Sequence, residues 1–393
     1  MAVKDSTRTQ ASAFESDDFF RGVKNRGTSP ATQIFSRAVI KTYFDTVYQP
    51  VGYPAGHLFG MKISNNASDP TNDIDIAVGQ CRDRANTADM ALTTALTGKQ
   101  LDVAWAVGSS AGFLDQGSIA NATYHVHCIK RSDTGVVDAI ASLSHDESAV
   151  ITMTIASPAV VTWGVAGNGH GLVAGSPVKF STTGALPTGV TAGTQYYVIA
   201  TGLTETAFQF STSNGGAAVN TSGTQSGVHT GLPGPKLPTS YDSFRRIASI
   251  VRTGSAIKPF VQSGDKFAWK VPVTDVNATA PGTAAVTRTL TIPTGLRIEG
   301  IVSVIGASNS GVADNPQGIL ITDLLQTDTT PTYPLNLFYS YSGAAFPMFT
   351  SSADIRVFAN RSAQVRSRVE ISAAATILII NTHGWIDTRG RLE

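Results

Sequence analysis

Cysteine is scarce in this sequence, since the 393 residues include only two, Cys81 and Cys128. Two cysteines cannot form the framework of disulfides that stabilises small secreted domains. We therefore expect two free, partly buried thiols. The chain is long enough for about two or three domains, so hydrophobic cores must stabilise it instead.

Charge is scarce too. Only 15% of the residues are Asp, Glu, Lys or Arg, against about 25% in an average globular protein. The 29 basic and 28 acidic residues leave a net charge of +1, so no long-range field attracts DNA, RNA or an anionic membrane. We expect no nucleic-acid partner, and we expect the clustered arginines to lie on solvated strand faces. These are Arg245, Arg246, Arg361, Arg366 and Arg368.

Long apolar runs are missing. The most apolar window extends from Ala149 to Val165 and is interrupted by Thr, Ser and Pro158. A membrane-spanning helix needs about 20 apolar residues, so no membrane insertion is expected. Lys4 and Arg8 precede any apolar run. This is not the pattern of an ordinary signal peptide, and we expect synthesis in a cytoplasm.

Glycine, threonine and valine are plentiful instead, which favours sheets and turns. In the last third of the chain, apolar segments recur about every 10 to 15 residues, as they do in an antiparallel sandwich. The clearest strand surrounds the sequence RSRVEIS, where Val365, Val369 and Ile371 alternate with charged residues.

Residues 150–236 have a different texture, with dense Gly and Thr, little charge and many tight turns. The runs VKF, QYYVIA and AFQFS predict short strands of a compact module. The segment from Gly231 to Pro238 is too rich in proline to be expected at the centre of a sheet. A strand pattern ends at DAIASLSHDESA and resumes at YDSFRRIASIV. Because removing the region would leave a turn of ordinary length, it is predicted to be an insertion.

The first residues are polar and lack a sustained period, which indicates an arm that orders against a partner. After residue 28 the sequence permits either a helix or a strand. Ser29 and Pro30 fit a helix start, and Phe35, Val39, Tyr43 and Val47 fit a helical stripe. The same segment is rich in β-favouring residues, so a strand is the alternative.

Together these patterns predict an all-β chain. It consists of tandem antiparallel β-sandwich domains, a small inserted β-barrel-like module and a mostly irregular N-terminal arm. The predicted boundaries are 1–57 for the arm, 58–149 and 237–273 for a discontinuous sandwich, 150–236 for the inserted module and 274–393 for a C-terminal sandwich.

Two motifs suggest catalytic or nucleotide chemistry, and neither has its required context. Residues 108–112 match G-x-S-x-G, but the sequence after Ser110 does not predict the helix that a nucleophile elbow needs. Residues 169–174 match G-x-G-x-x-A, but a strand is expected there instead of a phosphate-binding helix. His170 is therefore interpreted as a turn or packing residue.

Histidines and carboxylates do not form a recognisable site either. His125 and His127 share one strand face, as metal ligands in a sheet do, but no motif supplies a third ligand. We interpret them as surface or cross-strand histidines. His145 lies between Ser144 and Asp146, and neighbouring strand residues point to opposite faces, so this is no catalytic triad. We predict no catalytic residue, no metal site and no cofactor.

Several motifs carry a family resemblance. They are LDVAWAVGSSAGFLDQGSI, ATYHVHCIKRSDTGVVDAIAS, YDSFRRIASIV with IKPFVQSGDKFAWK, and the closing RSAQVRSRVEIS and ILIINTHGWIDTRGR. The first four resemble a module of tailed-bacteriophage tail fibre and related virion proteins, over roughly Leu58 to Val273. The closing run resembles the usual end of the same proteins. The insert resembles a small β-module of phage tail proteins that is similar to the FCCH domain of ubiquitin-activating enzyme. It matches at His170-Gly171, Gly175, Val178, Phe180, Leu186-Pro187, Gly189, Gly193 and Tyr196 to Val198.

The resemblance implies a non-enzymatic structural virion protein, made in the host cytoplasm, such as a tail fibre or tail-associated adaptor. We expect the arm to contact other virion proteins and the chain to form a homo-oligomer, with a trimer favoured. We also expect Trp163, Tyr196 and Tyr197 of the insert to contact a host-surface glycan or protein, since aromatic rings bind sugars well. The alternative is a purely architectural head decoration, head fibre or collar protein. A polysaccharide-cleaving tailspike would show a repeating β-helix pattern, and the sequence has none.

Overall fold

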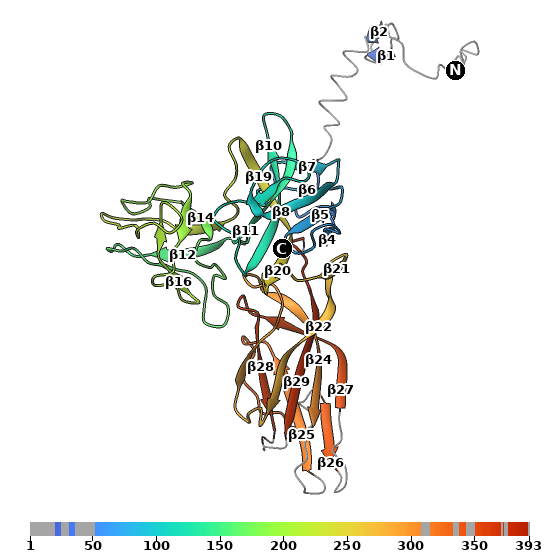
Figure 1. Cartoon of the computed structure of the whole chain (residues 1–393). Helices are drawn as coiled ribbons and strands as arrows, with labels where there is room; N and C mark the ends of the chain where they lie inside the picture. Colours follow the sequence, from blue (N-terminus) through green and yellow to red (C-terminus); the bar gives the residue numbers. More distant parts are fainter. Residues whose placement is uncertain are drawn as a thin grey trace, which may run out of the picture. The chain divides into compact units, whose positions relative to one another are not determined.

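The computed structural model describes residues 20–24, 31–35, 52–307, 315–332, 338–342, 350–370, 372 and 376–391. Every regular element among these residues is a β-strand (Figure 1), which confirms the all-β prediction. No helix long and apolar enough to cross a membrane occurs among them. The chain divides into two compact units, Met1–Pro54 and Ala55–Glu393.

The first unit contains an antiparallel pair, β1 (Phe20–Lys24) and β2 (Ala31–Phe35). β2 lies in the segment for which helix and strand were both open, and the strand alternative holds for these five residues. The remaining stripe positions, Val39, Tyr43 and Val47, fall outside the described residues.

We call the first part of the second unit the body. Its eight-stranded sheet has the order β20-β19-β10-β11-β9-β8-β5-β4, and a three-stranded sheet has the order β3-β6-β7. β9 pairs in parallel with β8 and β11, which departs from the expected antiparallel pattern. The strands are β3 (Leu58–Gly60), β4 (Ile63–Asn65), β5 (Asp73–Ile76), β6 (Gly79–Arg82), β7 (Asp89–Leu92), β8 (Leu96–Ala104), β9 (Gly112–Leu114), β10 (Thr123–Arg131), β11 (Val137–Ser142), β19 (Tyr241–Thr253) and β20 (Ala256–Ile257).

All strands between β11 and β19 form a separate seven-stranded sheet, which we call the module. Its order is β16-β13-β12-β18-β14-β15-β17. β18 lies between β12 and β14, so Gly231 to Pro233 are in the middle of the sheet, against the expectation from their proline content. The strands are β12 (Ala149–Met153), β13 (Val161–Thr162), β14 (Pro177–Thr182), β15 (Tyr196–Val198), β16 (Ala207–Phe208), β17 (Phe210–Ser211) and β18 (His229–Pro233).

The remaining strands form the C-terminal sandwich. Its two sheets have the orders β21-β22-β29-β24-β27 and β23-β28-β25-β26. The boundary expected at residue 273 falls inside β22, because this strand continues to Thr279 and pairs with β29. The strands are β21 (Phe260–Ser263), β22 (Lys266–Thr279), β23 (Val286–Thr289), β24 (Ile298–Ala307), β25 (Asn315–Thr322), β26 (Phe338–Ser342), β27 (Thr350–Ala359), β28 (Gln364–Val369) and β29 (Ile377–Ile386).

The hydrophobic cores do not follow the three parts one to one. Buried residues of the body and the C-terminal sandwich belong to one continuous cluster, whereas the module has a cluster of its own. In the sandwich, Phe267 stacks on Trp385 with ring centroids 5.0 Å apart. The module is therefore a separate hydrophobic unit.

Candidate functional site

β10 is buried on both faces. Tyr124, Val126 and Cys128 join the hydrophobic core. On the opposite face, His125 and His127 are only 1% and 0% exposed, so a surface location for them is wrong. The cross-strand alternative holds for His125, whose Nδ1 lies 2.9 Å from the hydroxyl of Ser249 on β19.

Four buried histidines gather where the chain enters the module, namely His125, His127, His145 and His170. The entry segment, residues 143–148, contributes His145, whose ring lies edge-on to His125 with centroids 6.0 Å apart. His145 Nε2 donates to the carbonyl of His170, at 2.8 Å, while its Nδ1 accepts the N–H of Glu147. His170 repeats this arrangement, with Nε2 donating to Thr204 and Nδ1 accepting from the main chain. Because one ring nitrogen accepts in each case, these bonds require neutral imidazoles.

Burial works in the same direction. Desolvation lowers the pKa of His127 to about 4 and that of His145 to about 3. For His145 the nearby positive charge of Arg361 adds to this effect. Burial also places the pKa of His125 well below its usual value. At neutral pH the cluster is uncharged and acts as hydrogen-bonding structure.

Two arginines join the entry segment to the C-terminal sandwich. Arg246 donates to both oxygens of Asp387, at 2.6 and 3.0 Å, and its Nε lies 3.3 Å from Asp146. Desolvation opposes the charge of Arg246, but Asp387 and Asp146 outweigh it and raise its pKa. Arg361 bonds Glu147 at 2.5 Å and also donates to the carbonyl of a module residue, His170, at 3.3 Å. We call this set of contacts the clamp.

The expectation that the clustered arginines are solvated is wrong for Arg245 and Arg246, which are both buried, while Arg361, Arg366 and Arg368 are half-buried. Adjacent strand residues point to opposite faces of a sheet, so two neighbouring arginines cannot share one solvent face. That spacing was the available signal in the sequence. The partners Asp146, Glu147 and Asp387 carried no such signal, because they lie about 100, 214 and 141 residues from the arginines they bind.

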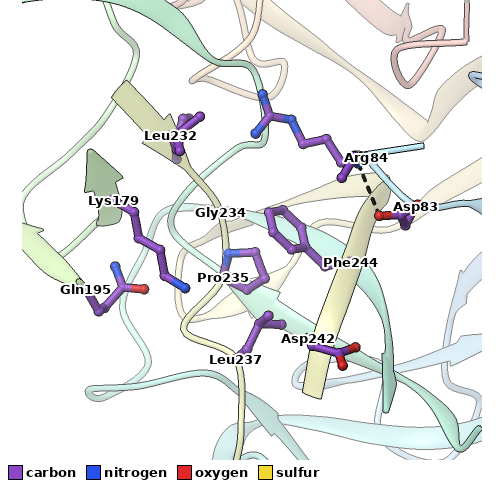
Figure 2. Close-up of a pocket in the computed structure, with 12 residues that line it drawn as sticks. Asp83, Arg84, Lys179, Gln195, Leu232, Gly234, Pro235, Leu237, Asp242 and Phe244 are labelled. Carbon is purple, nitrogen blue, oxygen red and sulfur yellow. Dashed lines mark hydrogen bonds between the residues drawn. The ribbon is translucent and has the colours of Figure 1, made fainter. Parts of the chain in front are cut away.

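A pocket of about 350 Å³ opens where the chain leaves the module (Figure 2). Its walls are mostly apolar and come from the exit segment, residues 232–237, and from Phe244 of β19. Gly234 allows this approach, since a Cβ there would lie 2.5 Å from the Phe244 ring. Ser144 links the module to the exit segment, because its hydroxyl donates to the carbonyl of Pro177 and accepts the N–H of Gly234. The polar residues at the pocket are Asp83, Arg84, Lys179, Gln195 and Asp242.

The three aromatic residues expected to contact a receptor lie inside the module. Trp163, Tyr196 and Tyr197 are 2%, 2% and 6% exposed. Trp163 covers Gly231, where a Cβ would come within 2.4 Å of the indole. The Tyr196 hydroxyl accepts the N–H of Thr191. These rings pack inside the module and offer no face to a ligand. Receptor contact by them remains a prediction, and their burial argues against it.

The loop that carries Ser110 is organised by a buried ion pair. Lys99 Nζ lies 3.2 Å from Asp138 and donates to the carbonyls of Ala106 and Gly108. Asp138 in turn accepts the N–H of Gly108. Ser110 lies in the turn just after these bonds and has a positive φ of 52°. No helix follows it, as the sequence predicted.

The structure also places the other motifs and candidate residues. β14 follows the glycines at 169 and 171, so a phosphate-binding helix is not formed there, and His170 is the packing residue that was predicted. Both cysteines are free and fully buried. Within the part of the chain that the structure describes, no group of three or more His, Cys, Asp or Glu side chains is arranged to hold a metal ion.

A comparison with protein-family models finds no match, and a comparison with curated proteins finds no similar sequence.

Proposed function

We propose that this chain is a structural bacteriophage virion protein, a tail fibre or tail-associated adaptor that mediates assembly and host-surface attachment. The motifs that resemble phage virion modules supply the class of protein. The clamp carries the proposal at the level of structure, because it gives a module with its own core a fixed attachment to the C-terminal sandwich.

The composition of the clamp fits a presenting role. Buried ion pairs add little net stability, because desolvation offsets their attraction, but they fix geometry where partners must meet in one arrangement. The hydroxyl of Ser144, the guanidinium of Arg361 and the ring of His145 all contact main-chain atoms of the module or the exit segment. The module is thereby held in one orientation, which suits a part that must contact an external surface.

Deleting the module tests attachment. Ala149 and Gly231 are partners across β12 and β18, so Gly-Gly can bridge the short gap that removal of residues 149–231 leaves. Phage carrying this deletion should assemble normal particles but adsorb poorly to host cells. Normal adsorption by such particles would contradict a role of the module in attachment.

A purely architectural role, as a head decoration, head fibre or collar protein, is the second candidate. The burial of Trp163, Tyr196 and Tyr197 favours it, because the expected aromatic contact surface is not exposed. Quantitative mass spectrometry of virions separates the two roles. A copy number in the hundreds, or in capsid-vertex multiples, supports the architectural role, whereas a few copies per tail supports the fibre.

A further inference from the structure

A second pocket, of about 340 Å³, lies beside the clamp and is lined largely by arginine. The body contributes Arg84, Arg245 and Arg246, and the end of the chain contributes Arg389. Asp146 and Glu147 of the entry segment line it as well. Four guanidinium groups around so small a space have to be balanced by negative charge.

The carboxylates nearby are already engaged. Asp146 and Asp387 bind Arg246, and Glu147 binds Arg361. Asp265 binds Arg389 at 2.6 Å and also bonds Arg391. This pairing leaves Arg84 and Arg245 without a salt bridge among the described residues, although Asp146 attracts both of them through space.

Arg245 makes the imbalance costly. Its side chain is buried, with the residue only 5% exposed, and it donates to main-chain carbonyls, those of Arg389 at 2.9 Å and Arg82 at 3.5 Å. Its Nε has no hydrogen-bond partner. A buried charge without a direct ion pair is unfavourable, so a guanidinium bonded only to carbonyls in this position points to a further negative group.

Arg84 is placed to complete such a site. It is half-buried, it lines the pocket, and no hydrogen bond from its side chain is found within the described part of the chain. Desolvation lowers the pKa of both Arg84 and Arg245 more than the charge of Asp146 raises it, and a bound anion would offset that effect. A guanidinium presents two parallel N–H groups, which match the oxygens of a carboxylate or phosphate.

We propose that this pocket binds a small anion with a phosphate or carboxylate group, held by Arg84 and Arg245. Ligand pockets usually begin at about 300 Å³, so the space fits a free phosphate or one acidic sugar and not a long polymer segment. The site depends only on the contacts of Arg84 and Arg245, and it does not require the virion role.

Titration calorimetry at low ionic strength on the full chain tests the site. The probes are inorganic phosphate, galacturonate and, as the uncharged counterpart, galactose. The key variant is Arg84→Gln, which removes the charge without breaking a hydrogen bond found in the structure. The matched control is Arg131→Gln, which removes an arginine of the body that pairs with Asp133 and does not line this pocket. Thermal melting establishes that both variants are folded.

We expect wild type and Arg131→Gln to bind phosphate or galacturonate, and Arg84→Gln to bind about tenfold or more weakly, since a hydrogen bond to a charged group contributes about that much. Binding of phosphate alone identifies a free phosphate site, and tighter binding of galacturonate identifies an acidic sugar site. Absence of binding by both anions overturns the proposal. Equal binding by Arg84→Gln, or galactose binding as tight as galacturonate binding, overturns it too.

Discussion

The buried pair of Lys99 and Asp138 shows how one charged side chain can organise a loop. Both residues are almost fully buried, and their bonds to residues 106 and 108 determine the path of the chain before Ser110. Desolvation lowers the pKa of Lys99, while Asp138 opposes this. The pair is therefore sensitive to the loss of either member.

Lys99→Met should destabilise the protein by about 3 to 5 kcal/mol, because Asp138 would remain as an uncompensated buried charge. The double variant Lys99→Met, Asp138→Asn should recover a large part of that loss, since no charge is left unpaired. Urea unfolding of the three proteins measures both effects. If the double variant is no more stable than the single one, the ion pair does not have the role assigned to it.

His127 provides a test of the neutral histidine cluster. Its pKa is about 4 in the folded chain, and an unfolded histidine has a pKa of about 6.5. Between these values the unfolded chain binds more protons. The contribution of His127 to the free energy of unfolding is therefore fully present above pH 6.5 and is lost as the pH decreases towards 4. His127 alone should account for about 3 kcal/mol of this loss.

Urea unfolding of wild type and His127→Gln between pH 7.5 and 4.5 measures the effect. Gln retains a donor for the Ser144 carbonyl, which His127 Nε2 contacts at 3.0 Å, but cannot titrate. The variant should show a shallower decline of stability. Asp115 acts in the opposite direction, because burial raises its pKa to about 7, but it is the same in both proteins and cancels in the comparison. Identical slopes would contradict the assignment.

At the scale of elements, local sequence patterns were sufficient to predict a strand and its buried side chains where one face of the strand meets solvent. β28 (Gln364–Val369) follows its predicted alternation, with Val365 and Val369 buried, although Ile371 lies outside the described residues. The strands β14 and β15 of the module also lie where the sequence placed them.

The same patterns failed where distant segments cover a strand. The second face of β10 is buried by Ser144, by Arg246 and by Gly295, whose Cβ position is 2.8 Å from His125 Nε2. These residues lie up to 170 positions away, so local alternation cannot reveal them. The candidate site was missed for the same reason, because each clamp bond joins residues that are remote in sequence.

β18 offers a test at this scale. Gly231 pairs with both Ala149 and Phe180 beneath Trp163. Gly231→Ala should destabilise the protein by about 1 to 3 kcal/mol, because the added methyl group forces the indole to move. Val150→Ala, on the exposed side of the neighbouring β12, is the control and should have little effect. Chemical denaturation compares the two, and equal stabilities would show that the Trp163 contact is not tight.

At the scale of the whole molecule, the distribution of hydrophobic clusters predicts how the second unit unfolds. The body and the C-terminal sandwich share one core, which includes Tyr124 of the body and Trp385 of the sandwich. The module has a separate core, which includes Trp163 and Phe180. Segments that share a core unfold together, and segments with separate cores can unfold separately.

Differential scanning calorimetry of the full chain should therefore show two transitions, one for the module and one for the body with the C-terminal sandwich. The variant in which Gly-Gly replaces residues 149–231 should retain only the second transition, at a similar temperature. A single transition in the full chain would mean that the clamp couples the module to the body as strongly as a shared core. Three transitions would mean that the body and the sandwich are independent despite their continuous core. A single transition would strengthen the case for rigid presentation of the module, because the orientation of the module would then persist up to the melting temperature of the whole unit.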